Sequence, residues 1–131
     1  MTDKYPDLSG ATSLDVAKEA AKLLFQKLSS DVTLISVASS ALTDYYVIGY
    51  GRSSTHVRAL ANDLADALTA SRVPLRRMEG VDTADWVLLD FGDVIVHIFG
   101  KEAGEFYRFE RLFKEEAFVP LDDLLASLDG K

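Results

Sequence analysis

The residues that could do chemistry in this sequence are the carboxylates Asp90 and Asp93 and the imidazoles His56 and His97. Paired carboxylates at this spacing could hold Mg²⁺, which prefers oxygen ligands. Asp93, however, follows Gly92 between two apolar runs, where a hairpin loop favours both residue types without a metal. The two histidines lie far apart in the sequence and form no recognisable ligand set, and no Ser-His-Asp pattern stands out. We therefore predict no catalytic residue, no metal site and no cofactor, and we expect a binding protein that is not an enzyme.

The apolar runs on either side of this loop predict the strands that position Asp90 and His97. Residues 86–90 and 94–99 form the strongest predicted strand pair, joined by a two-residue loop at Gly92 and Asp93. Side chains alternate between the two faces of a strand, so the pair has two distinct faces. The wholly apolar core face carries Val87, Leu89, Phe91, Val94, Val96 and Ile98. The opposite, mixed face carries Trp86, Leu88, Asp90, Ile95, His97 and Phe99.

The mixed face has the composition of a protein interface. In a core, Asp90 and His97 would each need a buried partner, and on a plain surface Trp86, Leu88 and Phe99 would be exposed together. Interfaces combine aromatic anchors with a few polar groups that fix the register. The alternative is that a later helix covers this face and that His97 pairs with Asp90. The pattern alone leaves both interpretations open.

The rest of the chain predicts one domain of mixed α/β (α+β) class over residues 1–131, with a flexible lead-in over 1–12 and a short acidic tail over 114–131. Helices are expected after an N-cap at Thr12 or Ser13 and after the turn at 51–54, where Ser53 or Ser54 would cap. The expected helices are 13–29, one with its apolar stripe over 57–68, 102–115 and 121–128. The expected strands are 32–37, 45–50, a weak edge strand at 75–79, 86–90 and 94–99.

The predicted helix 102–115 carries two stripes of side chains. Phe106, Phe109 and Phe113 recur at helical spacing, which is typical of core packing. Tyr107 and Glu110, together with the neighbouring Arg111, form a second stripe that would be a polar rim or part of a binding surface.

Composition narrows the class of partner. The formal net charge of −7 disfavours broad nucleic-acid binding and favours a basic protein partner, although such a charge can also serve solubility alone. The absence of cysteine excludes disulfides and thiolate metal clusters. No apolar run approaches the roughly 20 residues of a membrane span, and residues 1–10 do not resemble a signal peptide. We expect a cytoplasmic protein with no membrane partner.

Three blocks of the sequence resemble those of a known family. Residues 44–48 lead into Gly-Arg-Ser-Ser-Thr-His-Val at 51–57, residues 85–99 contain the hairpin, and 105–112 read Glu-Phe-Tyr-Arg-Phe-Glu-Arg-Leu. In this order they resemble the ribosomal silencing factor family, also called RsfS or Iojap, over about residues 13–113. Three positions depart from the family pattern: Gly104 stands where a basic residue is usual, Phe109 where leucine is usual, and Phe113 where tryptophan is common.

The resemblance implies a mixed five-stranded β-sheet flanked by helices, related to the nucleotidyltransferase fold, and a homodimer when free. It implies binding to ribosomal protein uL-fourteen on the large (50S) ribosomal subunit, which blocks association with the small subunit and represses translation when nutrients are scarce. The positions that it assigns to the ribosomal contact are Trp86, Asp90, His97, Tyr107 and Glu110, with Leu88 and Phe99 in support. Two alternatives stay open: a degenerate nucleotidyltransferase-like protein that binds a nucleotide or Mg²⁺, and a purely structural dimerisation module.

Overall fold

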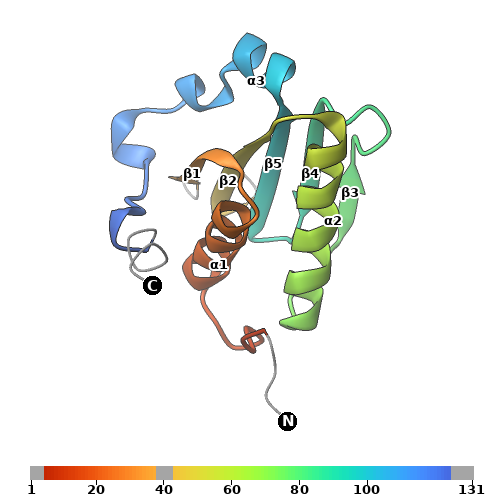
Figure 1. Ribbon diagram of the computed structural model, residues 1–131. Coiled ribbons are helices and arrows are strands. Elements are labelled where there is room, and N and C mark those ends of the chain that lie inside the picture. The colour runs from red at the N-terminus through yellow and green to blue at the C-terminus, as the bar shows by residue number, and fades with distance from the viewer. Residues whose placement is uncertain (1–4, 38–42, 125–131) are drawn as a thin grey trace.

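The computed structural model describes residues 5–37 and 43–124, apart from the side chains of Phe106, Tyr107, Phe109 and Glu116. A five-stranded sheet carries two long helices, α1 and α2, on one of its faces (Figure 1). The helices are α1 (Ser13–Gln26), α2 (Ser54–Ala70) and α3 (Lys101–Tyr107), followed by the 3-10 turns η1 (Phe109–Leu112) and η2 (Glu115–Ala117). The strands are β1 (Ser30–Ser36), β2 (Tyr45–Gly51), β3 (Arg77–Glu79), β4 (Trp86–Asp90) and β5 (Val94–Gly100).

The sheet is mixed, as predicted. Its strand order is β1-β2-β5-β4-β3, with β2 and β5 parallel and the other neighbouring pairs antiparallel. The crossover through α2 allows β2 and β5 to run in the same direction, because parallel strands need a long connection. The short, charged β3 lies at one edge, which confirms the weak edge strand expected near residues 75–79.

The register of the β4–β5 hairpin is the one that the alternation predicts. Trp86 pairs with Phe99, Leu88 with His97, and Asp90 with Ile95. The turn closes with the Phe91 N–H donating to the Val94 carbonyl over 2.9 Å. Gly92 has a φ of +92°, a conformation that side chains other than glycine adopt at a cost.

Side-chain hydrogen bonds account for where α1 and α2 begin, and a left-handed backbone conformation accounts for where α1 ends. The Thr12 hydroxyl accepts from the Asp15 N–H, and the Ser53 hydroxyl accepts from the His56 N–H, so both serve as N-caps. Helix α1 ends at Gln26, three residues before the predicted limit, because Leu28 adopts a φ of +70° and turns the chain into β1.

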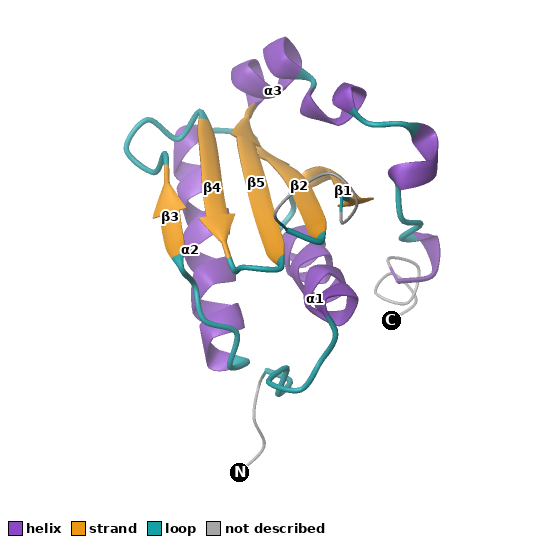
Figure 2. Ribbon diagram, turned by 180° about the vertical axis from the view of Figure 1, so that it is seen from behind, coloured by secondary structure: helices purple, strands orange, loops and turns teal. Residues whose placement is uncertain are grey.

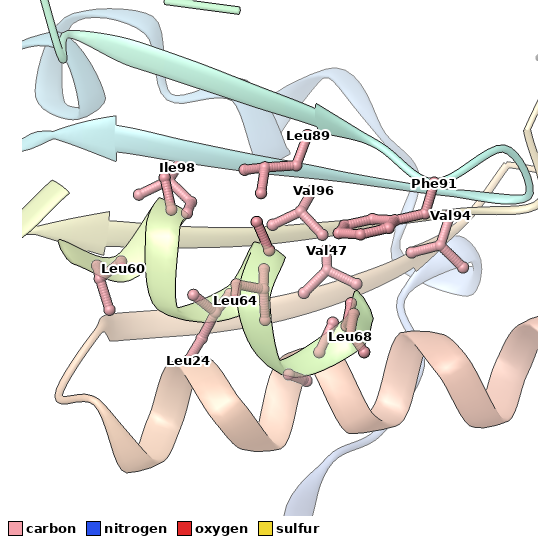
Figure 3. Packing of buried hydrophobic residues seen from close by; sticks show 14 of the residues in the cluster. Leu24, Val47, Leu60, Leu64, Leu68, Leu89, Phe91, Val94, Val96 and Ile98 are labelled. Atoms are coloured by element: carbon pink, nitrogen blue, oxygen red, sulfur yellow. The ribbon is translucent and has the colours of Figure 1, made fainter. Parts of the chain in front are cut away.

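The main core lies between the sheet and the two helices. Figure 3 shows the aliphatic residues of α1 and α2 meeting those of the strands across this layer. The helix-facing sheet residues are fully or almost fully buried: Val47, Val87, Leu89, Phe91, Val94, Val96 and Ile98. Every predicted core-face position of the hairpin is among them.

The predicted single helix over 102–115 is wrong. Arg108 has a φ of +47°, in the left-handed region, so α3 stops at Tyr107 and the chain continues through η1 and η2. Phe106, Phe109 and Phe113 therefore do not share one helix face. The chain then returns along β1, where Phe118 bridges Ile35 and the Val119 N–H donates to the Leu34 carbonyl.

The last predicted helix is seen only in part. Residues 122–124 are helical, and the remainder of the predicted 121–128 segment lies outside the described residues. None of the described helices is long and apolar enough to cross a membrane.

Candidate interaction face

The mixed face of the hairpin lies on the side of the sheet opposite α1 and α2. Seen from that side, no described helix lies over β3 or β4, α3 lies at the end of β5, and the C-terminal segment passes along the β1 side (Figure 2). We call this side of β4 and β5 the open face, made of Trp86, Leu88, Asp90, Ile95, His97 and Phe99. Trp86, Leu88, Asp90 and Ile95 are partly exposed.

A row of aromatic rings crosses the sheet at one end of this face. The register places Trp86 beside Phe99 and Phe99 beside Tyr50 of β2. The ring centroids of Trp86 and Phe99 are 5.0 Å apart, and those of Phe99 and Tyr50 are 5.7 Å apart. Phe99 is fully buried and lies between the two outer rings in the register, where it packs against both.

Glu110 joins this row through Tyr50. The Tyr50 hydroxyl donates a hydrogen bond to a carboxylate oxygen of Glu110, which lies in η1. Burial, with the nearby Glu110 carboxylate, raises the pKa of Tyr50 above its ordinary value of 10.0. The phenol thus stays protonated and serves as the donor.

His97 lies in the middle of the face but beneath its surface. Only 4% of the residue is exposed. Its Nδ1 accepts a hydrogen bond from the Trp86 indole N–H over 3.0 Å, and the Tyr46 ring meets the imidazole edge-on at a centroid distance of 4.7 Å. Burial lowers the pKa of His97 to about 4, so the ring is neutral at physiological pH.

Asp90 has partners other than His97. The alternative in which His97 pairs with Asp90 is therefore wrong. One Asp90 carboxylate oxygen accepts from the Gly92 N–H over 2.8 Å, and the other lies 3.6 Å from Nε of Arg77 on β3. Asp93 is exposed within the turn. Among the described residues, no group of three or more His, Asp or Glu side chains is placed to hold a metal ion.

A cavity of about 490 Å³ borders this face where β2 and β5 end. Its charged lining combines Arg52, Lys101 and Arg108 with Asp31, Glu105 and Glu110. Because the two signs balance, the lining selects neither an anion nor a cation. Gly104 forms part of the wall, and a Cβ there would come within 2.6 Å of the Tyr50 ring. The close contact of α3 with Tyr50 thus accounts for the glycine at this position.

The structure brings together most of the residues predicted for the site. Trp86, Leu88, Asp90, His97 and Phe99 share the open face, with His97 and Phe99 beneath it. Glu110 is linked to this group through Tyr50, whereas the Tyr107 side chain lies outside what the structure describes.

Sequence reasoning missed two supporting residues, Tyr46 and Tyr50 of β2. Alternation along the predicted strand 45–50 already placed them on one side of it. The missing information was the parallel pairing of β2 with β5, which sets Tyr46 beside Ile95 and Tyr50 beside Phe99.

Comparisons of this sequence with known proteins point to one family. A family model described as "Ribosomal silencing factor during starvation" matches residues 10–130. The ribosomal silencing factor of Zymomonas mobilis is 39% identical over 113 residues, with 81% of this chain and 85% of that protein covered. That of Bacillus subtilis is 33% identical, with 82% and 92% covered. A mouse protein, mitochondrial assembly of ribosomal large subunit protein 1, is 34% identical over 81% of this chain and 47% of its own length.

Solved structures share the fold. A crystal structure of a protein from Chromobacterium violaceum superposes with a TM-score of 0.75 at 26% identity, covering 83% of this chain and 93% of that one. A second, from Bacillus halodurans, gives a TM-score of 0.69 at 31% identity, covering 82% and 96%.

Proposed function

This chain belongs to the ribosomal silencing factor family, and on that premise we propose that it docks on the large ribosomal subunit through ribosomal protein uL-fourteen. The bound protein would stand in the way of the small subunit and so repress translation when nutrients are limiting. It would act by occupying a surface and not by catalysis. A homodimer of the free protein and a cytoplasmic location belong to the same proposal.

The observation that carries the proposal is the composition and exposure of the open face. Trp86 and Leu88 are large apolar side chains, both partly exposed and adjacent on β4, and Asp90 continues the same face. Partly exposed aromatic anchors that rest on a rigid layer are typical of residues that dominate binding energy. Asp90 adds a polar group that can fix the orientation of the partner.

The charge of the chain supports a basic partner. The net charge is −7, and the exposed Glu79 lies beside Leu88 in the register of β3 and β4. Ribosomal proteins are typically basic, so attraction between opposite charges would speed their encounter with this face. Packing of the apolar anchors would then determine how long the complex lasts.

The seven predicted contact residues take different parts in this proposal. Trp86, Leu88 and Asp90 are exposed enough to touch a partner, and Glu110 is partly exposed beside Tyr50. His97 and Phe99 are buried and would act through Trp86. Contact through Tyr107 stays a prediction.

Subunit joining is the direct test. Purified large and small ribosomal subunits are sedimented through a sucrose gradient with and without the protein, and then with the variants Trp86→Glu and Leu88→Glu. We expect the wild-type protein to sediment with the large subunit and to reduce the monosome peak, and both variants to be inactive. Asp66→Lys is the matched control, because Asp66 is exposed on α2, on the other side of the sheet.

Two results would contradict the proposal. If the wild-type protein stays at the top of the gradient and subunits join normally, docking on the large subunit is wrong, and nucleotide or Mg²⁺ binding near Asp90 and Asp93 becomes the hypothesis to measure. If the protein binds but Asp66→Lys abolishes binding while Trp86→Glu does not, the helix side is the docking surface.

A further inference from the structure

We propose that His97 is a positioning residue, which holds the Trp86 indole in its docking orientation without touching the partner. This inference rests on the proposed function, because it assigns the role of one residue within the same face.

Burial separates His97 from direct contact. The residue is 4% exposed, whereas Trp86, diagonally opposite on β4, is partly exposed. The centroids of the two rings are 5.9 Å apart, and the imidazole is also close to Phe99, at 6.5 Å. A partner that covers this face would therefore meet the indole before it could reach the imidazole.

The hydrogen bond gives Trp86 a fixed orientation. The indole N–H can only donate, and the 3.0 Å contact makes Nδ1 of His97 its acceptor. The neutral imidazole must then carry its proton on Nε2. The ring of Phe99, at 5.0 Å and tilted by 33°, supports the indole from a second direction. The directional bond to His97 and the packing contact with Phe99 both restrict the side-chain torsions of Trp86.

Tyr46 holds the imidazole itself in place. Its ring lies at 86° to the imidazole plane, an edge-to-face arrangement. Tyr46 in turn contacts Phe113 of the C-terminal segment, with centroids 5.8 Å apart. The orientation of His97 is therefore set by the packed sheet and does not depend on a bound partner.

A prearranged anchor strengthens binding because less conformational freedom is lost on docking. Without the acceptor, the Trp86 N–H would lose this hydrogen bond, and the indole would sample more orientations. We expect the loss of this one neutral hydrogen bond to weaken binding about three- to tenfold, with the fold preserved.

The test compares His97→Asn with His97→Leu. The two side chains branch at the same atom and are similar in size, so they leave similar voids. Only asparagine supplies an acceptor oxygen near the position of Nδ1. We expect His97→Asn to bind large ribosomal subunits nearly as well as the wild type, and His97→Leu to bind about three- to tenfold more weakly. His97→Phe, which keeps a ring against Tyr46 but has no acceptor, should behave like His97→Leu and serves if the smaller side chain impairs folding.

Two further readouts separate positioning from direct contact. Trp86 is the sole tryptophan of the sequence, so its fluorescence anisotropy decay reports its local motion without any partner. That motion should increase in His97→Leu and stay near the wild-type value in His97→Asn. In a Trp86→Ala background, His97→Leu should weaken binding no further, because its effect passes through the indole.

The outcomes also distinguish this inference from the proposed function. If Trp86→Ala binds large subunits normally, the docking face itself is wrong. If Trp86→Ala weakens binding but His97→Leu and His97→Phe bind like the wild type, the positioning role is wrong and the docking face stands. If His97→Leu weakens binding further in the Trp86→Ala background, His97 contacts the partner directly and the inference is overturned.

Discussion

The two faces of this sheet are built from alternate residues of the same strands, yet they solve opposite problems. Toward α1 and α2, Leu89 and its neighbours on β5 are fully buried among aliphatic side chains. Toward the open face, Leu88 and Trp86 are partly exposed beside a carboxylate and an imidazole. The buried face is stable if its side chains fill the space against the helices. The open face must instead keep partly exposed apolar side chains ordered in contact with water.

The difference shows how a face can expose enough apolar surface to bind another protein while its side chains stay ordered without that partner. Three polar groups on or beside the open face have hydrogen-bond partners within the protein: Trp86 donates to His97, Asp90 accepts from Gly92, and Tyr50 donates to Glu110. Satisfied polar groups cost little when a partner covers them, and they restrict the aromatic rings meanwhile. The described helix-side residues of the hairpin are all apolar, so they offer no side-chain polar group for such hydrogen bonds.

The largest expected effect comes from truncating two adjacent leucines of β4 that point to opposite faces of the sheet. Leu89→Ala should lower the free energy of unfolding by about 2–5 kcal/mol, because it leaves a cavity in the main core. Leu88→Ala should cost about 1 kcal/mol or less, because that side chain is partly exposed and its surroundings can relax. Urea unfolding of the two variants measures the difference.

The two variants should rank in the opposite order when binding to the large ribosomal subunit is measured in place of stability. At a temperature where both are folded, Leu88→Ala should weaken binding to the large subunit while Leu89→Ala leaves it near the wild-type level. Equal losses of stability would mean that the open face is packed as tightly as the core. Equal losses of binding would mean that the comparison of the two faces does not extend to function.

The hairpin was predictable because its information is local. Alternation from Trp86 to Asp90 and from Val94 to Phe99, with Gly92 and Asp93 between the strands, leaves one register that gathers a wholly apolar set of side chains on a single side. The same pattern could not tell that His97 and Phe99 would be covered. That cover comes from rings elsewhere in the chain, including Tyr46 and Tyr50 of β2.

The C-terminal region shows where such reasoning fails. Phenylalanines at 106, 109 and 113 fit the spacing of one helix, but the left-handed backbone at Arg108 ends α3 at Tyr107, one residue after Phe106. Arginine carries no intrinsic preference for that conformation, so the break is set by tertiary packing. The pairing of Phe118 with Ile35 is likewise a long-range contact without a local pattern.

A smaller effect is expected on the pH dependence of the free energy of unfolding, through the buried His97 of the open face. Burial lowers the pKa of His97 to about 4 from 6.5. As the pH falls below 6.5, the unfolded chain binds a proton that the folded protein excludes until about pH 4. The stability contributed by the neutral ring is therefore complete above pH 6.5 and is lost toward pH 4, by at most about 1.4 kcal/mol per pH unit.

His97→Asn removes this titration and leaves the helix-side face untouched. The free energy of unfolding, measured by urea at pH 7 and pH 5, should fall more for the wild type than for His97→Asn. Equal falls in the two proteins would show that other groups carry the acid sensitivity and that His97 is not buried as described.

The smallest effect concerns the charge at the edge of the open face. Arg77 is more than half exposed and lies 3.6 Å from Asp90, so Arg77→Gln should change the free energy of unfolding by less than about 0.5 kcal/mol. Asp90 would stay in place, because the Gly92 N–H still holds it. The Arg77 guanidinium, which also lies 3.2 Å from the Glu79 carboxylate, would then no longer offset the charges of Asp90 and Glu79.

A basic partner should then associate about two- to threefold faster at low salt, and the gain should fade as salt is added. Arg72→Gln is the matched control: Arg72 also pairs through Nε with an aspartate, at 3.7 Å from Asp7, but it follows α2 on the helix side. Both variants change the net charge equally, so only a local effect at the open face can separate their association rates, measured by stopped flow. A slower rate for Arg77→Gln would mean that Arg77 itself contacts the partner, and the partner surface facing β3 would then have to be acidic.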